Sequence, residues 1–202
     1  MTDSRLQELK RAWEASGSVE DEAAYLRERV RVGDLTQERL ELAAYCGHEG
    51  AQIAVTTCVQ SAPAEEWLSG LRSHGRKACA AAAAAAAHLG IAQLAHPNSA
   101  EAKEVASRAI AIAERYAAGG LELGALVARE VTGEAYLAAE GLPEPASLAT
   151  LAAAFASKTV YDSDPLGWPG EDFEQACRLH GTERVVAVVR KALIGFSLVN
   201  LE

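Results

Sequence analysis

Eight consecutive alanines, Ala80 to Ala87, constrain the fold of this chain more than any other stretch of its sequence. Alanine is the strongest helix former, and the tract is flanked by basic residues before it and by leucine and isoleucine after it, so we expect a helix. A side chain of one methyl group lets neighbouring helices approach toward the short end of the usual range of about 8 to 10 Å. The sequence therefore predicts a central helix over about residues 76 to 95, ended by Pro97 and surrounded by other helices.

Signals typical of helix starts and ends run along the whole chain, and no stretch indicates a strand. Ser18 and Thr36 are expected N-caps, and Gly33 is an expected helix end. Half of the 202 residues are hydrophobic but only 5% are aromatic, so small side chains must build much of the interior. We predict an all-α fold of about ten antiparallel helices, built around the alanine-rich central helix. We expect one domain over residues 1–202, in which 1–33 form a candidate N-terminal helical arm.

Three segments share a histidine placed just before a helix with small residues on its inner face. They are CGHEGAQIAV from Cys46, RSHGRKACAAA from Arg72 and LAHPNSAEAKEVA from Leu94. Over about residues 35–118 this pattern resembles the turn and second helix of HEAT and armadillo-type repeats. The resemblance implies a short HEAT-like α-solenoid, and an irregular helical bundle is the alternative. The stretch GDLTQERLELAAYCGHEGAQIA is also similar to alanine-rich helical proteins of bacteria whose function is unassigned, which implies no activity.

The charge of the chain restricts the class of its partners. The formal net charge is −9, which argues against a nucleic-acid binder because such proteins neutralise phosphates with Lys and Arg. We expect no membrane span, since alanine is only weakly hydrophobic and polar residues interrupt the one long stretch without formal charge. The charged, amphipathic first residues predict no signal peptide, and the irregular cysteine spacing favours a reducing compartment, so we expect a cytoplasmic protein.

The segment LRSHGRKAC holds the one local concentration of positive charge, with Arg72, His74, Arg76 and Lys77 around the start of the alanine helix. A helix N-terminus presents free N–H groups and the positive end of the helix dipole, so added cations there predict a site for a phosphate or a carboxylate. The alternative is a solvated loop whose cations carry no ligand.

Two further residues are candidates for binding a ligand or a partner. His88 lies inside the alanine tract, where it either lines a groove or is a paired core histidine. Trp168 lies in the irregular segment YDSDPLGWPG, where a tryptophan either fills a groove between helices or contacts a partner.

Residue types that bind zinc are present, but their spacing does not predict a site. Structural zinc sites show two tight ligand pairs, and neither of the two groups in this chain offers both. These groups are Cys46, His48, Cys58, His74 and Cys79, and separately Cys177 and His180. No motif for a nucleophile, a nucleotide or a cofactor is present, so we expect no metal, no cofactor and no catalytic residue.

We therefore expect a non-enzymatic protein-interaction or regulatory module that binds a partner through a helical groove, with an immunity protein as one version. An acidic surface suits a basic partner. The alternative is a helical protein that binds a small molecule or an anion through residues 72–77, and that in one version is an enzyme. Pairing of small-residue helices between copies of the chain is the third alternative.

Overall fold

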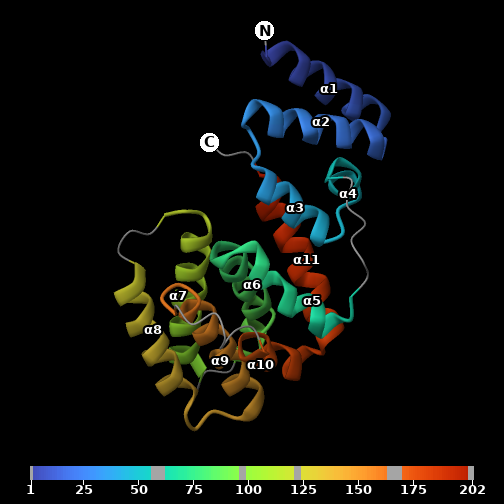
Figure 1. Cartoon of the computed structure of the whole chain (residues 1–202). Helices are drawn as coiled ribbons and strands as arrows, with labels where there is room; N and C mark the ends of the chain where they lie inside the picture. The colour runs from blue at the N-terminus through green and yellow to red at the C-terminus, as the bar shows by residue number, and fades with distance from the viewer. Residues whose placement is uncertain (1, 56–61, 96–98, 121–123, 163–169, 200–202) are drawn as a thin grey trace. The chain divides into compact units, whose positions relative to one another are not determined.

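The computed structural model describes residues 2–55, 62–95, 99–120, 124–162 and 170–199, and all secondary structure in these ranges is helical (Figure 1). The all-α prediction is therefore confirmed, and the solenoid form stays a prediction. The described helices are α1 (Thr2–Ser16), α2 (Val19–Val32), α3 (Gln37–Tyr45), α4 (Glu49–Val55), α5 (Ala64–Gly70), α6 (Arg76–His88), α7 (Ala100–Ala117), α8 (Gly124–Ala139), α9 (Glu144–Lys158), α10 (Gly170–His180) and α11 (Thr182–Leu198). Two 3₁₀ helices, η1 (Leu71–His74) and η2 (Ile91–Leu94), lie on either side of α6.

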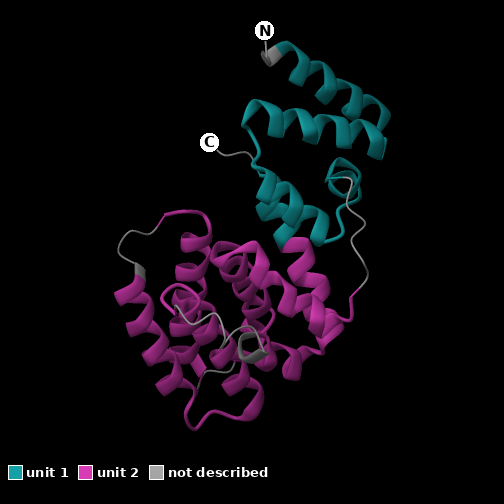
Figure 2. Ribbon diagram, in the orientation of Figure 1, with its two compact units in different colours: residues 1–61, 193–202 teal, residues 62–192 magenta. Residues whose placement is uncertain are grey.

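The chain divides into two compact units (Figure 2). Unit 1 comprises residues 1–61 and 193–202, and unit 2 comprises residues 62–192. Helix α11 contributes its first residues to unit 2 and its last residues to unit 1. The expectation of one domain with an N-terminal arm stays a prediction.

In unit 1, helix α2 packs against α1 and α4, and α3 packs against α4. The two expected caps are present: Ser18 accepts a hydrogen bond from the backbone N–H of Asp21, and Thr36 accepts one from Arg39. Gly33 ends α2 with a φ of 84°, a left-handed conformation that glycine adopts without strain. The core of this unit consists of small side chains and leucines, namely Ala23, Leu26, Leu35, Leu40, Ala43, Ala44, Ala51 and Ala54.

Two arginines of unit 1 bind the C-terminal end of α11. Arg29 is 4% exposed, and it donates hydrogen bonds to the carbonyl of Leu198 at 2.9 Å and to the carboxylate of Asp34 at 2.5 Å. Arg39 donates to the carbonyl of Phe196. Burial lowers the pKa of Arg39, and the nearby charge of Arg29 lowers it further. The last carbonyls of a helix lack partners within the helix, so these guanidinium groups satisfy them at the negative end of the helix dipole.

In unit 2, helix α9 packs against α6, α7, α8 and α10. It buries a run of small side chains that includes Ala149 and residues 152–154, and α6 buries all of Ala80–Ala87 except the half-buried Ala81 and Ala85. A Cβ added at Gly90, just after α6, would lie 2.9 Å from the Cβ of Ala149. The backbone at Gly90 therefore lies close against Ala149 of α9.

The alanine helix is shorter than the sequence predicts. We expected it to continue to about residue 95, but α6 ends at His88 and is followed by η2. Gly90 is buried at this point, and its contact with Ala149 leaves no room for a side chain. Leu89 and Gly90 keep right-handed helical dihedral angles, and the chain passes through them from α6 into the 3₁₀ turns of η2 before it reaches Pro97.

The buried face of α6 gives a direct test of the packing. Ala83 is 2% exposed, so Ala83→Leu should overpack the core and lower the free energy of unfolding by roughly 1 to 3 kcal/mol, measured by urea denaturation. Ala111→Leu on the exposed side of α7 is the matched control and should leave stability nearly unchanged. Equal stability of the wild type and Ala83→Leu would place that face of α6 in solvent.

Candidate functional site

The predicted basic cluster lies on the surface of unit 2 around the start of α6. Arg72, Arg76 and Lys77 are exposed, and His74 is half-buried at the end of η1. A Cβ added at Gly119 would lie 3.5 Å from Nζ of Lys77, so this ammonium group lies beside the C-terminal end of α7. The negative end of a helix dipole attracts a cation there, which gives Lys77 a structural role. A role of the cluster in anion binding stays a prediction.

His88 lies at the exposed end of α6. Its Nε2 is 2.8 Å from Oε1 of Glu114 on α7, and both side chains are about half exposed. His88 is therefore not a core histidine, and the His88–Glu114 pair is not enclosed in a pocket. An exposed contact of this kind joins two helices and adds little to stability. The predicted partner-binding role of His88 stays untested, and Trp168 lies outside the described residues.

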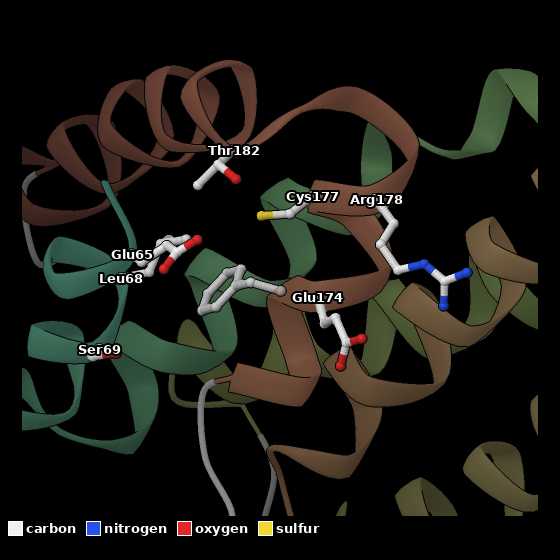
Figure 3. Close-up of a pocket in the computed structure, with 8 residues that line it drawn as sticks. Glu65, Leu68, Ser69, Glu174, Cys177, Arg178 and Thr182 are labelled. Carbon is white, nitrogen blue, oxygen red and sulfur yellow. The ribbon is translucent and has the colours of Figure 1, made fainter. Parts of the chain in front are cut away.

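A cavity of about 470 Å³ lies between α5, α10 and the start of α11 (Figure 3). We call it the α5–α10 cavity, and it is lined by Glu65, Leu68, Ser69, Phe173, Glu174, Cys177, Arg178 and Thr182. Figure 3 shows the carboxylate of Glu65 and the sulfur of Cys177 directed toward one another across the space, whereas the side chain of Arg178 extends away from it. Arg178 is instead 3.0 Å from the carboxylate of Glu144.

The surroundings of the Cys177 thiol in this cavity favour its protonated form. Burial raises the pKa of Cys177, and the charge of Glu65 raises it further, while a hydrogen bond with Thr182 acts in the opposite direction. The thiolate is the nucleophilic form of cysteine, so a raised pKa keeps this thiol in its unreactive form at neutral pH. No histidine is among the described residues that line the α5–α10 cavity, and the carboxylate of Glu65 faces the thiol.

A second hollow, of about 420 Å³, lies between the first half of α7 and the last turns of α8. We call it the α7–α8 groove, and it is lined by Glu101, Ala102, Val105, Glu134, Leu137, Ala138, Glu140 and Leu142. Ala102 and Val105 are buried and form an apolar floor. Three of the lining residues are glutamates and none is basic, so the groove combines an apolar floor with an acidic rim.

Next to the groove, α8 exposes large apolar side chains. Leu126 is 80% exposed and Leu137 is 68% exposed. Glu130 and Gly133 lie between them at separations of three and four residues, so all four residues share one face of the helix. We call these four residues the α8 outer face. A Cβ added at Gly133 would have no neighbour within 4 Å, so the middle of this face is open. Leu137 belongs both to the α8 outer face and to the α7–α8 groove.

Our sequence reasoning missed this surface, although a signal for it was present. Helix α8 buries Ala128, Val131 and Ala135 against the rest of unit 2, and the two leucines lie on the opposite side. A helix with apolar residues on both sides is either surrounded by protein or left with an apolar face to cover. The two stripes in GALVAREVTGEAYLAA therefore indicate a helix with apolar residues on its exposed side as well as on its buried side.

The structure also bears on metal binding and on the membrane. Within the described residues, no group of three or more His, Cys, Asp or Glu side chains is arranged to hold a metal ion. His48, one of the zinc-type residues, instead accepts a hydrogen bond from the backbone N–H of Ala51 at the start of α4. None of the helices in the described ranges combines the length and the apolar character that a membrane span requires.

Comparison of the chain with models of protein families, with curated proteins and with solved structures finds no match.

His180, at the end of α10, gives a prediction on pH. Burial lowers its pKa, and the charge of Arg184 lowers it further, while a hydrogen bond with the backbone of Leu89 opposes both effects. The folded state therefore favours the neutral imidazole, so its contribution to stability is present above pH 6.5 and is lost as the pH falls through the lower pKa of the folded state. The free energy of unfolding should fall between pH 7.5 and pH 5, as measured by urea titration at each pH, and this fall should be smaller in His180→Gln. Parallel pH curves for the two proteins would contradict the assignment.

Proposed function

We propose that this chain is a non-enzymatic protein-interaction module whose partner covers the α8 outer face and enters the α7–α8 groove. One observation is the main support for the proposal: Leu126 and Leu137 are 80% and 68% exposed on one face of a helix whose other face is buried. Large exposed apolar patches mark interaction sites more often than they mark ordinary surface. Because Leu137 also lines the groove, the exposed face and the hollow form one continuous surface.

The chemistry of unit 2 supports a binding role over a catalytic one. Among the described residues, the α5–α10 cavity holds a thiol with a raised pKa, and the α7–α8 groove holds carboxylates with no cysteine, serine or histidine in its lining. The alternative, a small-molecule or anion site at Arg72, Arg76 and Lys77, has only exposed cations in its favour. The irregular spacing of the cysteines favours a reducing compartment, so we propose that the module acts in the cytoplasm.

The proposal is tested by capture of partners from the native cells. The tagged full-length chain and its double variant Leu126→Ser/Leu137→Ser are used, and recovered proteins are quantified by mass spectrometry. We expect at least one protein whose recovery falls about tenfold or more with the double variant, because removal of two central apolar contacts costs more than about 1.4 kcal/mol of binding free energy. The melting temperature should not change, since neither side chain is in the core.

Val199→Ser is the matched control for this experiment, because Val199 is 61% exposed in unit 1 and lies outside the proposed surface. Its pattern of recovered proteins should equal that of the wild type. If no protein depended on Leu126 and Leu137, the proposed function would be wrong.

A further inference from the structure

We propose that the α7–α8 groove binds a basic amphipathic segment of a protein partner, which places an apolar side chain on the floor and Lys or Arg side chains at the rim. The inference rests on the proposed function and adds the chemistry of the partner to it. Its basis is charge complementarity at a surface that is apolar in the middle and acidic around the edge.

The acidic rim is suited to cations at more than one position. Glu134 forms an ion pair with Arg108, so its charge is already balanced. Glu101 and Glu140 are exposed, and no basic side chain within the described residues forms an ion pair with either of them. Beside the Arg108–Glu134 pair, the groove therefore presents two carboxylates that no described basic side chain pairs with.

The position of the groove strengthens this preference. Its Glu134, Leu137 and Ala138 belong to the last turns of α8, and Glu140 directly follows the helix. The C-terminal end of a helix has the negative end of the dipole, and cations near it are stabilised by roughly 0.3 to 1 kcal/mol. The carboxylates and the C-terminal end of the helix thus both attract a Lys or Arg side chain of the partner.

The apolar part of the surface matches a helical segment in length. Leu126 and Leu137 are eleven residues apart on α8, which corresponds to about 16 Å or three helical turns. A partner helix of three to four turns with leucine-like side chains on one face covers this distance. Glu101 and Glu140 line the groove together with Leu137 at the C-terminal end of α8, so basic residues are favoured and acidic ones repelled at the end of the partner helix that lies there.

A second copy of this chain suits the surface less well. The formal net charge of each copy is −9, and the rim of the groove is acidic, so two copies repel one another here. A stable interface buries about 800 Å² on each partner, and one helix face three turns long provides only part of that area. A short segment from a basic partner is attracted by the acidic rim, and it does not need an interface of that area.

The experiment uses a defined probe, a fluorescent 14-residue helical peptide of leucine and lysine with all leucines on one face. Its affinity for the full-length protein is measured by fluorescence anisotropy and compared with that of the same peptide carrying glutamate in place of lysine. We expect the lysine peptide to bind at least tenfold more tightly. Its affinity should fall as salt is raised from 50 to 200 mM, because exposed charges are screened.

Matched variants locate the site. Glu101→Gln/Glu140→Gln should weaken binding of the lysine peptide about tenfold and reduce the salt dependence, and Leu137→Ser should weaken it with the salt dependence unchanged. Glu66→Gln/Glu174→Gln removes the same amount of charge from exposed positions of unit 2 outside the groove, and its affinity should stay within twofold of the wild type.

Three outcomes would overturn the inference. Equal weakening by the two double-glutamine variants would mean that only the overall charge attracts the peptide. Equal affinity of the lysine and glutamate peptides would show that the groove does not prefer a basic partner. A molar mass from sedimentation that rises to that of a dimer with increasing protein concentration, and that stays at the monomer value in Leu137→Ser, would mean that a second copy of the chain covers this surface. The proposed function is judged separately, by whether a cellular protein is lost with Leu126→Ser/Leu137→Ser.

Discussion

Close approach of helix backbones at alanine and glycine is the constraint on which the structure of unit 2 depends. Helix α9 lies against four other helices and buries mostly small side chains, and the alanine tract of α6 packs in the same unit. The contact between Gly90 and Ala149 leaves no space for even one added methyl group. Small side chains bury less apolar area per residue than large ones do. Dense packing offsets this loss through dispersion contacts, since protein interiors are packed as tightly as molecular crystals.

The same constraint accounts for the proposed site. Helix α8 meets this core through Ala128, Val131 and Ala135, so its large leucines have no place inside and lie on the other side. The buried stripe of α7 that includes Ala102 and Val105 then forms the floor of the groove. The apolar surface offered to a partner is thus a consequence of how the small-residue helices pack.

Local sequence signals predicted much of the fold, and long-range contacts decided the rest. The caps Ser18 and Thr36 and the helix end at Gly33 are local features, and all three were predicted correctly. The end of α6 was not, because we expected the helix to continue to about residue 95 and to end at Pro97, whereas α6 ends at His88 and is followed by η2. The groove lies between α7 and α8, and from the sequence we did not distinguish the buried face of α8 from its exposed one. The predicted candidates at 72–77 and His88 were chosen for residue type and for their position on or beside the alanine helix. In the structure Arg72, Arg76 and Lys77 are exposed and His74 is half-buried, and the exposed His88 contacts Glu114.

The most direct test of the central claim is photo-crosslinking in the native cell from a diazirine amino acid placed at position 126 or 137. The account predicts a covalent adduct between each position and one basic, amphipathic segment of another protein, identified by mass spectrometry of the crosslinked peptide. Recovery of water-quenched product alone at both positions, or of adducts to acidic segments, would contradict it.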